Sequence, residues 1–173
     1  DLNGCSVTSA CASGYTVYVA GLMSLRDSGT GGAVGTLSNT SGKGSCIHVA
    51  AGGSFSLERG TVTGTYGVLV QGGAANAAKA NLSGGKVEGT QHGVFVLGNR
   101  AGLSDGQDTR EPYLAEVAIS GSAEIVSTGI RNGAGHPGGP AVEIEGLGAK
   151  LSIDGGTIKG GPGYGAVSGN GSL

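Results

Sequence analysis

Short apolar triplets recur along the chain. They occupy Val17–Val19, Ile47–Val49, Val68–Val70, Val94–Val96 and Val142–Ile144, and their middle residues differ in character. Alternation with a period of two is typical of β-strands, in which successive side chains point to opposite faces. We therefore expect the first and third residues of each triplet to face a core, and the middle residue to face outwards.

A second recurring pattern is built around glycine. Segments 55–64, 80–89 and 151–161 each place an aliphatic residue before a glycine-containing corner and another after it. Glycine reaches backbone angles that strain other residues, so it suits tight turns between strands. The pattern predicts a second set of inward residues at Leu57, Leu82, Ile119 and Ile153, and a third set at Val62, Val87, Ile125 and Ile158.

The spacing of the triplets predicts the fold. Their last residues are separated by 30, 21, 26, 48 and 23 residues along Val19, Val49, Val70, Val96, Ile144 and Val167. Repeats of about 20 to 50 residues are typical of solenoids. We interpret the longest interval as one coil with two loop excursions, at residues 97–116 and 128–140. The expected fold is all-β: a right-handed parallel β-helix with three-stranded coils and about six rungs, a single domain or fragment within a longer solenoid.

Composition narrows the possible function classes. The 173 residues include 39 glycines, yet 38% are hydrophobic, which argues against both a collagen-like and a disordered chain. Ten basic and twelve acidic residues give a formal net charge of −2. No basic run stands out, so nucleic acid is not expected as a partner. No apolar run is long enough to span a bilayer.

Two of the three cysteines are close in sequence. Cys5 and Cys11 could close a small loop in an oxidising compartment, and this local disulfide is the expected arrangement. The alternatives are free thiols or a bond that involves Cys46. A zinc site is less favoured, because the spacing is not Cys-x2-Cys and no histidine is near the pair.

Outward acidic residues do not predict a catalytic pair. Glu58 and Asp154 are expected to face outwards three rungs apart, which is about 14 Å at 4.8 Å per rung. Inverting glycosidases hold their two carboxyl groups about 6.5–9.5 Å apart. This distance is too large for a catalytic pair, so no catalytic residue is expected. A carbohydrate-active enzyme related to pectate lyases or polygalacturonases remains the alternative to a non-catalytic function.

The remaining titratable residues do not predict a site either. His48, His92 and His136 fall in different coils or loops, so no catalytic set follows from their spacing. Segment 105–111 holds three carboxylates but lacks the spacing of a calcium-binding loop. We expect neither a metal nor a cofactor.

The chain resembles a known family of bacterial surface proteins. The residues that carry the resemblance are Ala141–Ile144, the glycine-rich segment 151–161, and Ala166–Val167. Together they are similar to the passenger domains of pertactin-like autotransporters. The resemblance implies a right-handed β-helix that is secreted or exposed at the outer surface of Gram-negative bacteria. It also implies an adhesin or binder of host proteins, attached to the membrane only through a translocator that this chain does not contain.

Two regions are candidates for binding a host protein or glycan. The first is the stripe of middle residues of the triplets, Tyr18, His48, Leu69, Phe95 and Glu143, since exposed apolar stripes mark contact surfaces. The alternative is that a loop covers this stripe. The second is the pair of excursions at 97–116 and 128–140, because loops on a rigid scaffold carry specificity. The first excursion contains Arg100, Asp105, Asp108, Arg110, Glu111 and Tyr113. The alternative for these excursions is a surface loop whose sequence varies without a function. The alternative for the whole chain is a spacer that holds another domain away from the cell.

Overall fold

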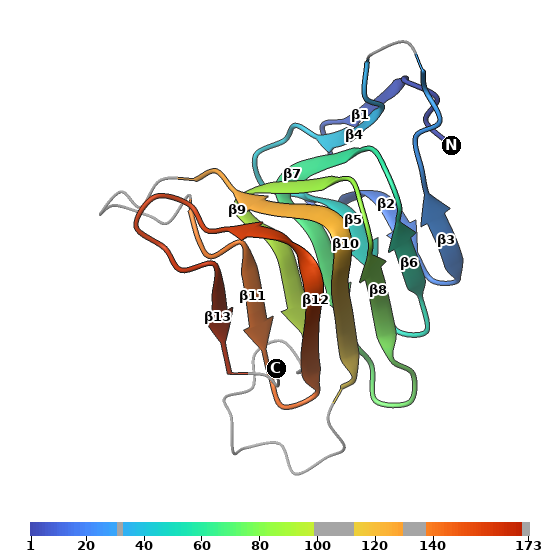
Figure 1. Cartoon of the computed structure of the whole chain (residues 1–173). Coiled ribbons are helices and arrows are strands. Elements are labelled where there is room, and N and C mark those ends of the chain that lie inside the picture. The colour runs from blue at the N-terminus through green and yellow to red at the C-terminus, as the bar shows by residue number, and fades with distance from the viewer. Residues whose placement is uncertain (31–32, 99–112, 130–137, 171–173) are drawn as a thin grey trace.

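The chain forms a single curled sheet of parallel strands. The computed structural model describes residues 1–30, 33–98, 113–129 and 138–170, and in these it has 13 strands and no helix. The sheet curls into a half-barrel, as Figure 1 shows. All pairings between the named strands are parallel, and they fall into three ladders of stacked strands.

The first ladder contains the apolar triplets. Its strands are, in spatial order, β2 (Tyr15–Val19), β5 (Ser45–Val49), the end of β7 (Thr61–Gln71), the end of β9 (Lys86–Leu97), β11 (Val142–Glu145) and β13 (Val167–Gly169). Val96 pairs directly with Ile144. β9 and β11 are therefore neighbours in this ladder, although β10 lies between them in the sequence.

The other two ladders complete the sheet. The second joins β3 (Leu22–Leu25), β6 (Ser54–Leu57), β8 (Ala78–Leu82), the start of β10 (Ala115–Ser127) and the start of β12 (Ala149–Lys159). The third joins β1 (Ser6–Ser9), β4 (Thr36–Asn39), the starts of β7 and β9, and the ends of β10 and β12. Strands β7, β9, β10 and β12 thus run through a corner from one ladder into the next.

Aliphatic columns form the core. Leu25, Leu57, Leu82, Ile119 and Ile153 are register partners in the second ladder, and Leu37, Val62, Val87, Ile125 and Ile158 in the third. Leu57, Leu82, Val62, Val87 and Ile125 are 0% exposed. Each column buries apolar surface only because neighbouring rungs cover it, which is the usual source of stability in stacked repeats.

Two predicted inward positions differ in the structure. Ile153 is 47% exposed, because β12 pairs with β10 on one side and no described strand covers its other side. Val167 was expected to align with Ile144, but it pairs with Val142, two residues earlier on that strand. Gly169 occupies the aligned position, and a glycine gives no apolar signal in the sequence.

Glycines at the corner between the second and third ladders are required by both conformation and space. Gly60 and Gly85 have φ angles of +108° and +71°, in the left-handed region that side chains disfavour. A Cβ on Gly85 would lie 2.6 Å from the carbonyl oxygen of Gly60. The corners therefore stack backbone against backbone from one rung to the next.

The N-terminal rung is held by a buried carboxylate. Asp27 is 2% exposed and accepts hydrogen bonds from the backbone N–H groups of Gly35, Gly4 and Gly29 at 2.9, 2.7 and 3.2 Å. These bonds lower the pKa of Asp27, with a smaller contribution from the charge of Arg59. The contacts join the loop that follows β3 to the segments that lead into β1 and β4.

The structure does not form the predicted disulfide between Cys5 and Cys11. Both thiols are free and exposed. The four residues from Ser6 to Ser9 form the extended strand β1, which advances about 3.3 Å per residue and keeps the two cysteines apart. Cys46 is buried, and its thiol donates to the carbonyl oxygen of Leu37 at 3.2 Å.

Candidate functional site

The predicted stripe of middle residues is one column of register partners. Tyr18, His48, Leu69, Phe95 and Glu143 follow one another on successive strands of the first ladder. We call this set the middle column. Tyr18 is 50% exposed, and the other four are half-buried. The register thus brings together five side chains that are up to 125 residues apart in the sequence.

A second column runs beside the first. Tyr15, Ser45, Tyr66 and His92 are register partners on the same ladder, and we call them the corner column. The rings of Tyr66 and His92 stack with centroids 5.7 Å apart, and Tyr66 also stacks on Phe95 at 5.5 Å. At the N-terminal end, Tyr15 stacks on Tyr18 at 4.9 Å. The two columns together form one aromatic face.

Sequence reasoning missed the corner column, although a signal was present. Each of its members lies three residues before a member of the middle column. The alternation breaks between them at Gly67 and Gly93, which are buried where the strand bends through the corner. A Cβ on Gly67 would lie 2.5 Å from Val87. A recurring aromatic residue at that fixed offset was therefore the usable signal.

Two hollows open on the aromatic face, on either side of His48. The larger, of about 420 Å³, is lined by residues that include Tyr15, Ser45, His48 and Tyr66, with Lys43 at its rim. The smaller, of about 220 Å³, lies between Tyr18, His48 and Gln71. A cavity of about 300–1,000 Å³ lined by aromatic side chains and a few polar groups is typical of small-ligand sites.

Burial favours the neutral form of the two histidines of the aromatic face. Burial lowers the pKa of His92, which is 7% exposed, although its Nδ1 donates to the Pro140 carbonyl oxygen at 3.0 Å. Burial also lowers the pKa of His48, while a hydrogen bond with Gln71 acts in the opposite direction. Both shifts favour the neutral imidazole.

Two carboxylates end the aromatic face at β11. Glu143 and Glu145 both point outwards from this strand, two residues or about 6.6 Å apart. Burial raises the pKa of Glu143, the neighbouring charge of Glu145 raises it further, and a hydrogen bond with Ser168 lowers it. Sequence reasoning compared only the acids of the second ladder and so missed this pair. The alternation Val-Glu-Ile-Glu was the signal for it.

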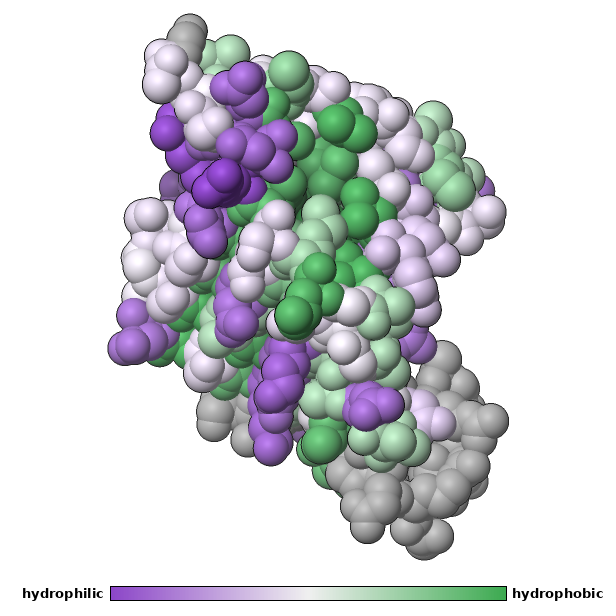
Figure 2. Space-filling model, turned by 90° about the vertical axis from the view of Figure 1, so that its right-hand side faces the viewer, coloured by the Kyte–Doolittle hydropathy of each residue, from purple (hydrophilic) through white to green (hydrophobic). Residues whose placement is uncertain are grey.

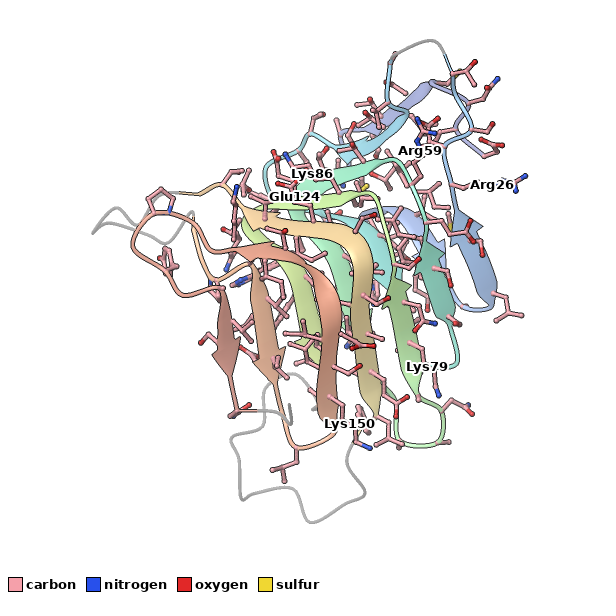
Figure 3. The ribbon with its side chains drawn as sticks, viewed as in Figure 1. Arg26, Arg59, Lys79, Lys86, Glu124 and Lys150 are labelled. Atoms are coloured by element: carbon pink, nitrogen blue, oxygen red, sulfur yellow. The ribbon has the colours of Figure 1, made fainter. Side chains whose placement is uncertain are left out.

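The outer face of the second ladder is mixed in character. The Nζ atoms of Lys79 and Lys150 lie 3.1 and 4.0 Å from the carboxylate oxygens of Glu116. Figure 2, which views the side of the molecule where β3, β6 and β8 lie, shows hydrophilic side chains beside hydrophobic ones. In Figure 3 the labelled charged residues are spread over the sheet and do not gather at one place. On the described part of this face, the charges of Lys79, Glu116 and Lys150 offset one another in a single cluster.

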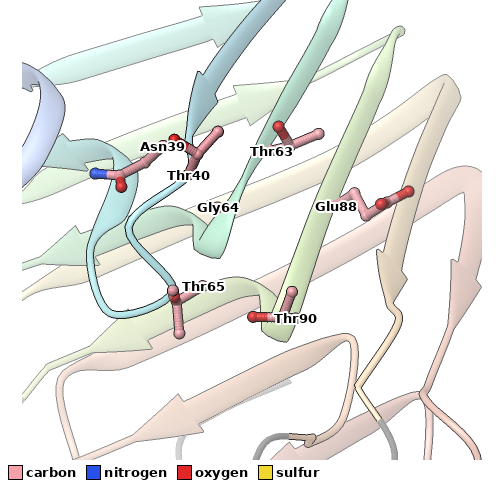
Figure 4. Close-up of a pocket in the computed structure, with 8 residues that line it drawn as sticks. Asn39, Thr40, Thr63, Gly64, Thr65, Glu88 and Thr90 are labelled. Carbon is pink, nitrogen blue, oxygen red and sulfur yellow. The ribbon is translucent and has the colours of Figure 1, made fainter. Parts of the chain in front are cut away.

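A third hollow lies at the corner between the third and first ladders (Figure 4). It measures about 200 Å³ and is lined by hydroxyl and amide groups together with one carboxylate, from Asn39, Thr40, Thr63, Thr65, Thr90 and Glu88. The Glu88 carboxylate is paired with the Lys86 ammonium at 2.6 Å. The Oγ1 atom of Thr65 is buried without a hydrogen-bond partner in the described residues. This hollow is polar, and small for a ligand site.

Most of the predicted loop residues lie outside the described residues: Arg100, Asp105, Asp108, Arg110 and Glu111. Tyr113 is described and half-buried. It directly precedes Leu114, whose carbonyl oxygen accepts from Ala78 N in the second ladder at 3.0 Å. Tyr113 therefore does not belong to the aromatic face, and the strand that follows begins at Ala115, inside the predicted excursion.

Metal ligands do not cluster in the part of the chain that the structure describes. No group of three or more His, Cys, Asp or Glu side chains there is placed to hold an ion. The same residues contain no helix that is long and apolar enough to cross a membrane.

The aromatic face is the candidate site because it combines exposed aromatic rings with a hollow of ligand size. The register of the paired strands fixes the positions of both. Comparisons with known proteins add no assignment. No family model matches the chain, and neither the curated proteins nor the solved structures gave a match.

Proposed function

We propose that this chain is a non-catalytic binding segment of a bacterial surface protein. In this proposal the curled parallel sheet is the wall of a right-handed parallel β-helix with three-stranded coils, of the kind found in pertactin-like autotransporter passengers. The chain would be exposed at the cell surface or secreted. It would act by presenting its aromatic face to a host protein or glycan.

The observation that carries the proposal is the continuous aromatic face of the first ladder. Tyr18 and Tyr15 are 50% and 40% exposed, so much of their ring surface is open to solvent. Aromatic side chains supply large contact areas at a low cost in conformational entropy, and they are enriched in binding surfaces. A rigid ladder holds them in place, which reduces the ordering cost of binding.

The test uses a variant in which part of the middle column is replaced and the core residues are unchanged. The double variant Leu69→Ser/Phe95→Ser changes two outward residues, and we expect it to keep its unfolding transition. Binding of the wild type and the variant would be compared on an array of glycans and purified extracellular-matrix proteins. We expect at least a tenfold loss of affinity for the ligand that the wild type selects.

A matched control uses the second ladder. The double variant Lys79→Ser/Glu116→Ser also replaces two outward side chains, but it removes only an exposed ion pair. We expect its binding to equal that of the wild type. Equal binding by the Leu69→Ser/Phe95→Ser variant would contradict the assignment of the aromatic face.

A second candidate function is glycoside hydrolysis, and it is favoured by the Glu143–Glu145 pair. The Cα atoms of these two outward residues are about 6.6 Å apart along the strand, so both carboxylates lie at one surface, and inverting glycosidases use two carboxyl groups. Glu143, with its raised pKa, would donate a proton to the glycosidic oxygen as the bond to the anomeric carbon breaks. Glu145 would accept a proton from the water that attacks this carbon. Release of reducing sugar by the wild type and its loss in Glu143→Gln would support this function over binding alone.

A further inference from the structure

The corner column contains a gap one residue wide. Tyr15, Ser45 and Tyr66 are consecutive register partners, so Tyr15 and Tyr66 are two rungs apart, or about 9.6 Å. Where rings occupy consecutive rungs of this column they stack, as Tyr66 and His92 do at 5.7 Å. Ser45 is therefore a position at which the stack lacks a ring.

The larger hollow of the aromatic face occupies this gap. Its volume is about 420 Å³, and it is lined by Ser45, which is 5% exposed, and by Tyr15 and Tyr66 from the two neighbouring rungs. His48 and Leu69 of the middle column form the adjoining wall. One ring inserted above Ser45 would have an aromatic neighbour on each side.

The lining determines which kind of ring would fit. Serine and tyrosine hydroxyl groups and the His48 imidazole surround the hollow, and they can both donate and accept hydrogen bonds at the edge of a polyhydroxylated ring. Tyrosine rings offer apolar faces against which C–H groups pack. Lys43 is exposed at the rim, and among the described residues that line this hollow none is acidic.

We propose that the gap above Ser45 is a binding slot for a single pyranose ring that carries a carboxylate, as in a uronic or sialic acid unit of a glycan. The ring stacks between Tyr15 and Tyr66, and its carboxylate pairs with the Lys43 ammonium. This inference rests on the proposed function, because it names the ligand class and the subsite of the same aromatic face.

The test is an NMR titration of the isotope-labelled chain with a glucuronate-containing oligosaccharide. A neutral oligosaccharide of equal length and 4-hydroxybenzoate serve as comparison probes. We expect saturable shifts of the Tyr15, Ser45 and Tyr66 amides with the acidic sugar, and at least tenfold weaker binding of the two comparison probes. Saturation with 4-hydroxybenzoate but not with the acidic sugar would overturn the sugar assignment, as would an absence of shifts with all three.

Two variants test the slot itself. Ser45→Phe supplies the missing ring, and we expect it to abolish binding of the acidic sugar while the amide spectrum stays dispersed. Because Ser45 is buried, Lys43→Gln provides an independent surface variant, expected to weaken binding of the acidic sugar at least fivefold and to remove its salt dependence. Unchanged binding in Lys43→Gln would overturn the pairing. Unchanged binding in a folded Ser45→Phe variant would overturn the slot.

The two proposals fail in different ways. If the array ligand is lost in Leu69→Ser/Phe95→Ser but retained in Ser45→Phe, the aromatic face binds its partner and the slot is wrong. If neither variant changes the binding of the array ligand, the aromatic face itself is wrong.

Discussion

The imidazole of His92 is fixed between Tyr66 and Pro140. Its ring stacks on Tyr66 with centroids 5.7 Å apart and an interplanar angle of 17°, while its Nδ1 donates to the Pro140 carbonyl oxygen at 3.0 Å. Gly138, Gly139 and Pro140 are buried where the chain returns to the sheet before β11. The aromatic face is thus joined to the segment that leads into β11, and this arrangement makes the stability of the fold depend on pH.

Protonation of His92 should destabilise the fold. Burial lowers its pKa in the folded state, so the unfolded chain takes up the proton first as pH falls. The contribution of His92 to stability is complete above the unfolded value of about 6.5 and is lost as pH decreases towards the folded pKa. We expect the free energy of unfolding, from urea titrations, to decrease between about pH 7.5 and 5.

His92→Phe isolates this effect, because it keeps a ring in the stack. The variant should show a flatter dependence of stability on pH than the wild type. Glu143 acts in the opposite direction: its raised pKa stabilises the fold at low pH, and this contribution is lost as pH rises through the folded value. The comparison of wild type and variant cancels the Glu143 contribution. Parallel pH curves would show that His92 is not the titrating group.

The aliphatic column of the second ladder should be a major source of stability. Leu82 is 0% exposed and lies between Leu57 and Ile119. Leu82→Ala therefore leaves a cavity, which could close only if both neighbouring rungs moved inwards. We expect a loss of about 2–5 kcal/mol in the free energy of unfolding. The control is Lys79→Ala on the same strand, which should change stability by less than about 1 kcal/mol. Similar losses in both variants would contradict a packed core at this column.

Comparison of Gly85 with Gly42 distinguishes two reasons for glycine at a turn: a positive φ angle and a lack of space for a Cβ atom. Both have φ near +70°, at +71° and +73°, but a Cβ on Gly85 would lie 2.6 Å from a backbone oxygen and a Cβ on Gly42 would meet nothing within 4 Å. Gly42→Ala should therefore cost only the conformational strain, about 1–2 kcal/mol. Gly85→Ala should exceed this by at least about 1 kcal/mol. Equal thermal shifts in the two variants would show that the corner relaxes without cost.

The three thiols should differ in reactivity. Burial raises the pKa of Cys46 to about 12, so this thiol should not react with an aromatic disulfide reagent in the native state. Cys5 and Cys11 are exposed, and both should react at once. The expected result is two thiols in native protein and three after unfolding. A count of zero in native protein and one after unfolding would indicate that the two N-terminal cysteines are linked after all.

The register of the first ladder was predictable because its signal is physical. Val68, Val70, Val94 and Val96 are 0% exposed, and a packed core requires apolar residues at such positions. The same reasoning failed at Val167, since Gly169 removes the aliphatic residue that marks the register. It also failed at Ile153, because burial depends on a further rung and sequence alternation does not report one.

The candidate site was predictable only in part. The middle column follows from alternation within one strand, whereas Tyr66 and His92 lie beyond a bend at which alternation stops. The hollow above Ser45 depends on the absence of a ring between two others. Such a gap lies between strands, so alternation within one strand does not indicate it.

Four rungs of the first ladder, from β2 to the end of β9, each add one residue to the middle column and one to the corner column, while aliphatic residues repeat on the inward side. Duplication of a rung would lengthen the aromatic face by about 4.8 Å. A substitution at one outward position would then decide whether the new rung adds a ring or a slot. New specificities could therefore evolve by copying and single substitutions, with the packing of the core left unchanged.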